Sequence, residues 1–110
     1  MPATYDDANL VMQIVRWGTE MDLTDAVRTV LADDFDPEAA SPDDPAVQKI
    51  LNFGEVVGTL VNQGVLDRGL VLDMWWMQGL WSRVGPAARR MREHLGEPRL
   101  SENFEKIAGH

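Results

Sequence analysis

The chain has 110 residues, no cysteine and a formal net charge of −8. A chain of this length can bury enough surface to fold as one domain without a metal ion or a disulfide. The lack of cysteine excludes disulfide scaffolds, thiolate metal sites and cysteine nucleophiles. No apolar run approaches the ~20 residues that a membrane-spanning helix needs, and the acidic N-terminus does not resemble an export signal. We therefore expect a cytoplasmic protein with no membrane span.

The negative charge is concentrated in the first half of the chain. Residues 1–46 hold eleven acidic and two basic side chains, whereas residues 47–110 hold seven acidic and eight basic ones. Because an acidic surface repels the phosphate backbone, we expect no nucleic-acid binding. Solubility accounts for this surface more simply than mimicry of a nucleic acid does.

The first third of the chain predicts two short helices. The first helix should begin near Asp6 or Asp7, either of which can cap it, and should end near Glu20. The apolar residues that follow fall on a different face of the helical wheel, so one continuous helix fits the pattern poorly. We place a break near Asp22 and a second helix over about 23–33.

An acidic, proline-rich loop is predicted over residues 33–45, which contain six acidic residues and three prolines. Phe35 is the residue expected to anchor this loop to the core. Asp34, Asp36 and Glu38 have the spacing of the first three ligands of a calcium-binding loop. The match then fails, because the sixth position is not glycine and the twelfth is proline rather than glutamate.

The third helix carries the clearest amphipathic pattern. An aspartate cap followed by Pro45 predicts its start, and the pattern continues to about Asn62. Gly54 and Gly58 lie four residues apart within the apolar arc of this helix. Since glycine inside a helix costs about 1 kcal/mol relative to alanine, the pair predicts a close crossing with another helix.

A fourth helix is predicted over residues 68–84, after a glycine-containing turn. Trp75 and Trp76 project away from its main apolar stripe, so this helix is apolar nearly all round. Such a helix is either central in a bundle or covered by a partner. Gly85-Pro86 should break or kink the helix before a fifth segment, and Ser101 should cap a short last helix.

Together these elements predict an all-α fold. The expected architecture is a compact bundle of five to six helices around a central helical hairpin, about 46–62 and 68–84. We expect a single helical domain over residues 1–110, with the acidic loop as its one long connection.

The centre of the chain also carries a pattern of apolar, acidic and glycine residues. Its members are Asn52, Phe53, Glu55, Val57, Gly58, Leu60, Val61, Gly64, Leu66 and Asp67, then Leu70, Val71 and Asp73, then Trp81 and Pro86. The pattern resembles that of a family of small bacterial helical domains of unknown function, over about residues 8–96. It departs from the family pattern at Gly54 and at Trp75-Trp76. The resemblance implies a helical fold and brings no activity, substrate or cofactor with it.

Other motifs give no support for catalysis or for a bound group. His94 and His110 have no metal-ligating partner at helical spacing. Gly64 and Gly69 have the spacing of a phosphate-binding loop, but the lysine and serine or threonine that must follow are absent. Ser82 lacks the glycines of a nucleophile elbow. We therefore expect no catalytic residue, no metal ion and no cofactor, and hence no enzyme.

Asp73 is the one acidic residue predicted near the apolar stripe of the fourth helix. We expect its carboxylate to be partly buried. A structural ion pair with an arginine such as Arg89 or Arg92 explains such an acid better than a catalytic role does.

The tryptophan pair is the best candidate for a functional surface. Aromatic side chains and arginine are enriched at the centres of protein interfaces, so we predict that Trp75, Trp76 and Arg83 bind a partner. The predicted function is a non-catalytic protein-protein interaction module, a homo-oligomer or an accessory subunit, that uses the tryptophan-bearing face of helix 68–84. Two alternatives stay open: the tryptophans belong to the core, or they line a pocket for a small molecule.

Overall fold

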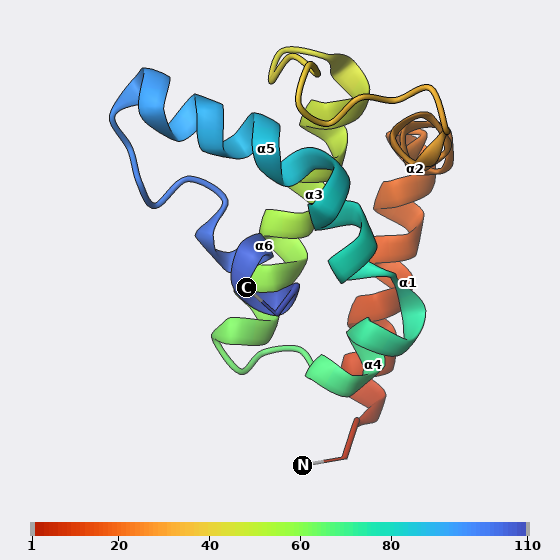
Figure 1. Cartoon of the computed structure of the whole chain (residues 1–110). Coiled ribbons are helices and arrows are strands. Elements are labelled where there is room, and N and C mark those ends of the chain that lie inside the picture. Colours follow the sequence, from red (N-terminus) through yellow and green to blue (C-terminus); the bar gives the residue numbers. More distant parts are fainter. Residues whose placement is uncertain (1, 110) are drawn as a thin grey trace.

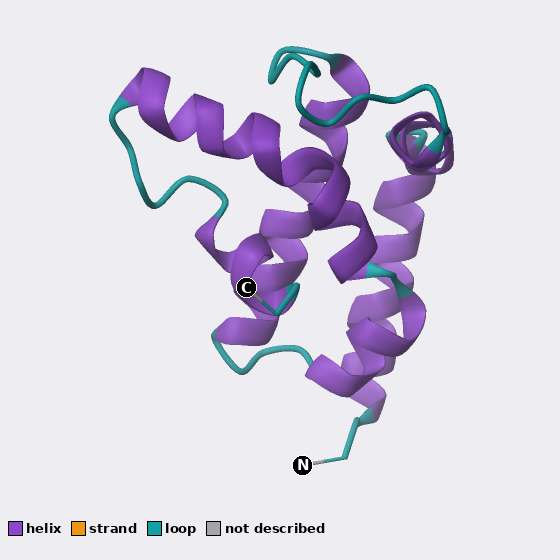
Figure 2. Cartoon of the chain, in the orientation of Figure 1, coloured by secondary structure: helices purple, strands orange, loops and turns teal. Residues whose placement is uncertain are grey.

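The structure is a computed structural model that describes residues 2–109. Within this range the chain forms six helices and no strand, as Figure 1 and Figure 2 show. The all-α class predicted from the sequence is confirmed. The helices are α1 (Tyr5–Glu20), α2 (Leu23–Leu31), α3 (Pro45–Asn62), α4 (Arg68–Met74), α5 (Met77–Leu95) and α6 (Glu102–Ile107).

Helix α1 begins with a capping box. Thr4, rather than Asp6 or Asp7, is its N-cap residue: Thr4 Oγ1 accepts a hydrogen bond from Asp7 N at 3.2 Å, and Asp7 Oδ2 accepts one from Thr4 N at 2.7 Å. Asp7 Oδ1 also accepts a hydrogen bond from Asp67 N at 2.9 Å, which joins the start of α1 to the start of α4. These bonds, first the one from the Thr4 backbone, lower the pKa of Asp7 below its ordinary value of 3.8.

The break between α1 and α2 lies at Asp22, as predicted. Asp22 takes a left-handed conformation, with φ 57° and ψ 49°, which aspartate tolerates better than most residues do. Asp22 occupies the N-cap position of α2, where an aspartate can cap a helix, but its side chain makes no capping hydrogen bond. Helix α2 ends at Leu31, two residues before the predicted end.

Helix α3 starts as the sequence predicts. Asp44 Oδ1 accepts a hydrogen bond from Ala46 N at 2.9 Å, and Pro45 occupies the first turn, where its missing N–H has no helical partner to lose. The helix packs against α2, α5 and α6, so it runs through the middle of the bundle (Figure 1).

Gly54 and Gly58 form the groove of α3 that receives α6. A Cβ atom on Gly54 would lie 2.2 Å from the ring of Phe104, and one on Gly58 would lie 2.4 Å from the backbone oxygen of Asn103. No side chain fits at either position while α6 remains in place. The predicted close crossing is confirmed, and the crossing element is α6.

The carboxylate of Glu55, the residue of α3 that follows Gly54, caps α6. Glu55 Oε1 accepts hydrogen bonds from Asn103 N at 3.0 Å and from Phe104 N at 2.9 Å, and Glu55 Oε2 accepts one from Asn103 Nδ2 at 2.9 Å. Ser101 occupies the N-cap position, but its side chain makes no capping hydrogen bond. The predicted serine cap is therefore wrong, because a carboxylate from another helix binds the free N–H groups.

The predicted helix over residues 68–84 is wrong, because the chain breaks at the tryptophan pair. Trp75 is extended, with φ −130° and ψ 140°, and separates α4 from α5. Its ring packs edge-on against Phe53 of α3, with ring centroids 5.3 Å apart. The second arm of the predicted hairpin is thus two helices, and the extended backbone at Trp75 goes together with the packing of its ring on Phe53.

Gly85-Pro86 was predicted to break or kink the helix, and a break is wrong, since α5 continues through it to Leu95. Proline disfavours a helical conformation in the preceding residue mainly through that residue's Cβ, which Gly85 lacks. A Cβ at Gly85 would also lie 2.9 Å from the buried indole of Trp81. Gly85 therefore lets the helix continue into Pro86 and leaves room for the buried ring of Trp81.

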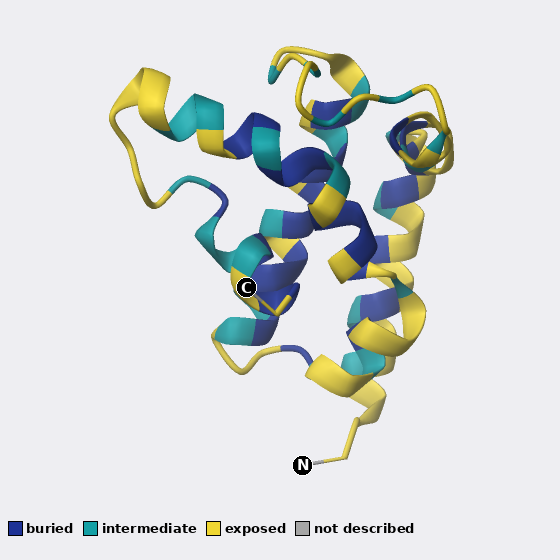
Figure 3. Ribbon diagram, viewed as in Figure 1, coloured by how far each residue is buried: buried dark blue, intermediate teal, exposed yellow. Residues whose placement is uncertain are grey.

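The core lies along the inward faces of α3 and α5, where Figure 3 shows the buried residues. Two aromatic clusters occupy it. Phe53 lies between Trp17, whose ring is 5.9 Å away and stacked, and Trp75. Trp81 meets Phe104 edge-on at 5.1 Å. Three of the four tryptophans thus stabilise the fold, and Trp76 does not share their burial.

Candidate functional site

The three residues predicted to bind a partner differ in exposure, since Trp76 is exposed whereas Trp75 and Arg83 are partly buried. Trp75 is half-buried and packs on the core through Phe53. Its ring therefore serves the fold, which is one of the two alternatives that the sequence left open for the tryptophans.

Trp76 is exposed over 66% of its surface and occupies the N-cap position of α5 without making a capping hydrogen bond. Its ring lies over Gly79, because a Cβ at that position would be 2.1 Å from Trp76 Cδ2. Gly79 is itself buried. The glycine thus provides a seat for the ring, and a large aromatic surface is held in place while facing solvent.

Arg83 is committed to contacts within the chain. Its Nε donates to the carbonyl of Val30 at 2.6 Å, and its Nη2 donates to the carbonyls of Ala32 and Phe35 at 2.7 and 3.1 Å. The guanidinium also lies 5.3 Å from the centre of the Phe35 ring. Arg83 therefore caps the end of α2 and fixes the start of the acidic loop, and Phe35 anchors that loop as predicted.

Helix α4 turns one face to solvent, and sequence reasoning missed this face because it assumed a longer helix. Leu70 and Val71 point to the core, whereas four other residues of α4 fall in an arc of about 140° on the opposite side, at about 100° per residue. Val65 and Trp76, which flank α4 in the chain, are exposed as well, and Met74 is exposed outside this arc. We use the name α4 face for the exposed residues Val65, Arg68, Gly69, Leu72, Asp73 and Trp76.

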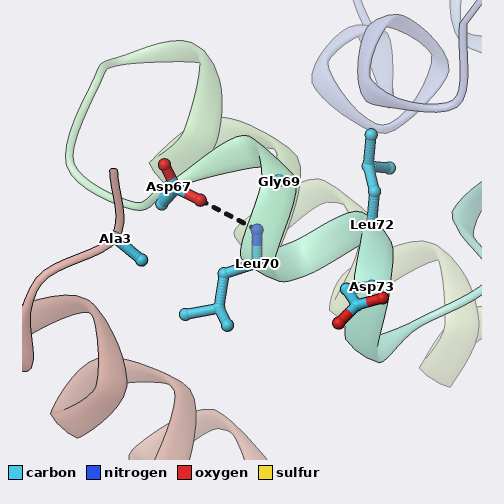
Figure 4. A pocket seen from close by; sticks show the side chains of 6 residues that line it. All are labelled: Ala3, Asp67, Gly69, Leu70, Leu72 and Asp73. Atoms are coloured by element: carbon cyan, nitrogen blue, oxygen red, sulfur yellow. Dashed lines mark hydrogen bonds between the residues drawn. The ribbon is translucent and has the colours of Figure 1, made fainter. Parts of the chain in front are cut away.

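A shallow depression of ≈ 490 Å³ lies on the α4 face (Figure 4). Gly69, Leu72 and Asp73 line it together with Ala3, Asp67 and Leu70. Asp67 Oδ2 accepts a hydrogen bond from Leu70 N at 2.9 Å and so caps α4 from the rim of the depression. Its lining combines the carboxylates of Asp67 and Asp73 with glycine and apolar residues.

Asp73 is exposed, so the prediction that it is partly buried is wrong. Arg89 and Arg92, proposed as its partners, pair with Glu105 instead. Glu105 Oε1 lies 3.0 Å from Arg92 Nη2, and Glu105 Oε2 lies 3.9 Å from Arg89 Nη2. The carboxylate of Asp73 is thus left on the α4 face, because α5 continues past Pro86 and carries both arginines to α6.

Among residues 2–109 no group of three or more histidine or acidic side chains is close enough to hold a metal ion. His94 is exposed near the end of α5, and His110 lies outside the described residues. None of the described helices is both long and apolar enough to cross a bilayer.

Comparison of the chain with curated proteins and with solved structures gives no match. A family model does match, over residues 10–110, and its description is "Domain of unknown function (DUF4760)". The match covers the whole helical bundle from α1 to α6 except the first residues of α1. The likeness to a helical family of unknown function is thereby confirmed, and the chain belongs to this DUF4760 family.

Proposed function

We propose that this domain is a non-catalytic protein-protein interaction module, as a homo-oligomer or as an accessory subunit, and that its contact surface is the α4 face. The observation that carries the proposal is the exposure of Trp76. A tryptophan has about 150–250 Å² to bury, so covering the exposed two-thirds of Trp76 would contribute about 3 kcal/mol at about 25 cal/mol per Å². Such rigid aromatic anchors dominate the binding energy of many interfaces.

The arrangement favours this proposal over the tryptophan-lined pocket. The ring of Trp75 is occupied by Phe53, and the ring of Trp76 lies on the outer surface over Gly79. The depression on the α4 face is lined by neither tryptophan. In the proposal the partner is a cytoplasmic protein rather than a nucleic acid, because a net charge of −8 repels phosphate.

Replacement of Trp76 tests the proposal, and Leu95 offers a matched control. Both residues are large, apolar and exposed, at 66% and 61%, and Leu95 lies at the far end of α5. Trp76→Gln should abolish association, measured by sedimentation and by cross-linked capture from the native cell, whereas Leu95→Gln should retain it. Circular dichroism should remain helical for both variants. Equal binding by the two variants would exclude the α4 face as the contact surface.

A further inference from the structure

Two depressions adjoin where the loop between α5 and α6 passes α3. Their volumes are ≈ 360 Å³ and ≈ 390 Å³, and both are lined by Glu55, Leu100 and Ser101. The first is also lined by Gln48, Leu51, Asn52 and Met91, and the second also by Glu97, Arg99, Glu102 and Asn103. We call the two depressions together the loop pocket. No residue of the α4 face belongs to it.

We propose that the loop pocket binds a primary ammonium group carried on a short chain of methylene groups. The methylene chain would lie in the first depression, and the ammonium group would lie where the two depressions meet, beside Glu55 and Ser101. The inference does not rest on the proposed function, because it uses a different surface. Three features carry it: an apolar part of the pocket, negative charge without an ion-pair partner, and a hydroxyl group without a hydrogen-bond partner.

The first depression has an apolar lining. Leu51 is buried, Met91 and Leu100 are partly buried, and all three line it. Its volume lies within the range of about 300–1,000 Å³ that small-molecule sites occupy. A methionine side chain is flexible and adapts to the shape of an apolar ligand. A chain of methylene groups can therefore be buried here without leaving a polar group unpaired.

The second depression carries negative charge that no cation of the chain neutralises. Arg99 Nη2 lies 3.0 Å from Glu102 Oε1, so these two charges balance each other. Glu55 and Glu97 make no ion pair with any described residue. No three acidic side chains of the described range are close enough to hold a metal ion. The pocket therefore favours an organic cation.

Ser101 supplies an observation that is independent of charge. Only 8% of this residue is exposed, and its side chain makes no hydrogen bond within residues 2–109. The fully buried polar side-chain atoms that lack a partner in this range are Trp81 Nε1 and Arg92 Nη2, so Ser101 Oγ is not fully buried. Since Ser101 lines both depressions, its hydroxyl group reaches solvent in the loop pocket. There it can accept a hydrogen bond from an ammonium N–H.

The loop pocket is formed before any ligand binds. Arg92 Nε donates to the carbonyl of Leu100 at 2.7 Å and so fixes the loop wall. Glu55 is fixed by the three hydrogen bonds that it accepts from Asn103 and Phe104. A carboxylate has about four acceptor sites, so one remains for a ligand. A site that is already ordered loses little entropy on binding.

Amide NMR titrations of the full-length chain test the ligand chemistry. The probes are n-pentylamine, which is protonated at neutral pH, n-pentanol and pentanoate, at fixed ionic strength. We expect n-pentylamine to shift the amides of Ser101 and Asn103 to saturation, with a dissociation constant in the millimolar range, and pentanoate to bind about tenfold more weakly or less. No saturable shift at these amides overturns the proposal, and so does equal affinity for n-pentylamine and pentanoate.

Two substitutions test the roles of single residues without touching the α6 cap. Ser101→Gly removes the hydroxyl group, and the left-handed backbone at φ 59° suits glycine, so the chain should fold while n-pentylamine binds about threefold to tenfold more weakly. Glu97→Gln keeps an acceptor for Arg99 N and should weaken binding about twofold to fivefold. Glu93→Gln, at an exposed position outside the pocket, is the matched control and should bind as wild type does. Unchanged affinity in both pocket variants overturns the assignment.

The ammonium group can come from a free amine or from a lysine side chain of another protein, and a blocked lysine distinguishes them. If Nα-acetyl-lysine N-methylamide binds within about threefold of n-pentylamine, the pocket accepts a protein lysine. If it binds about tenfold more weakly or less, the ligand is a free amine. Trp76→Gln should leave every titration unchanged, because Trp76 lies outside the loop pocket.

Discussion

Removal of the Glu55 side chain should detach α6 from the groove of α3. Its carboxylate accepts three hydrogen bonds, from Asn103 N, Phe104 N and Asn103 Nδ2, at 2.9–3.0 Å. Loss of a helix cap costs about 0.5–2 kcal/mol, and the third bond adds about 1 kcal/mol. Glu55→Ala should therefore lower the free energy of unfolding by about 1.5–3 kcal/mol. At about 4–8 °C per kcal/mol, the melting temperature should fall by roughly 6–24 °C.

Thermal and urea unfolding followed by circular dichroism measure the loss, and hydrogen exchange at the amides of Asn103 and Phe104 localises it. Glu55→Gln keeps one acceptor oxygen but turns a donor toward Asn103 Nδ2, so it should fall between alanine and wild type. Glu93→Ala, at an exposed position of α5, is the matched control and should change stability by less than about 0.5 kcal/mol. A Glu55→Ala chain that melts within about 2 °C of wild type would refute the capping role.

Three further substitutions test separate parts of the fold. Hydrogen bonds lower the pKa of Asp7 in the folded chain below 3.8. The contribution of Asp7 to stability is therefore complete above pH 3.8 and is lost as the pH falls through the folded pKa. Urea unfolding across acidic pH should show this loss in wild type and not in Asp7→Asn. Arg83→Lys cannot reach all three carbonyls and should cost about 2 kcal/mol in the same assay, with faster hydrogen exchange in the loop. Pro86→Ala restores a helical N–H within α5 and should stabilise the fold by roughly 1–3 kcal/mol, which a higher melting temperature would show. A lower melting temperature would mean that packing of the proline ring contributes more stability than the restored hydrogen bond.

The sequence predicted those helices whose ends depend on local chemistry. Helix α3 begins where an aspartate cap precedes Pro45, and its two glycines marked the crossing before the crossing element was known. The break at Trp75 could not be predicted in this way. At the break Trp75 contacts Phe53, 22 residues earlier, and the helical wheel of residues 68–84 contains no sign of that contact.

The candidate site was predicted only in part, because it too depends on contacts between residues far apart in the sequence. Trp76 was chosen for its residue type and is exposed, but Arg83 was added only because it is close in sequence. Its three carbonyl partners lie 48 to 53 residues away. Asp73 was expected to be partly buried, because in a helix that continued to residue 84 it would lie beside the apolar stripe. Its exposed place in the last turn of a seven-residue helix depends on the break at Trp75.

The acidic loop is held by its backbone and not by its acidic side chains. Arg83 binds the carbonyls of Ala32 and Phe35, and Arg90, seven residues further along α5, binds those of Pro37 and Ala40. Every amino acid offers a carbonyl oxygen, so these contacts make no use of the acidic side chains of the loop. Apart from Phe35, whose ring packs on the core, the loop can therefore lose negative charge while the arginine contacts that fix its path stay the same.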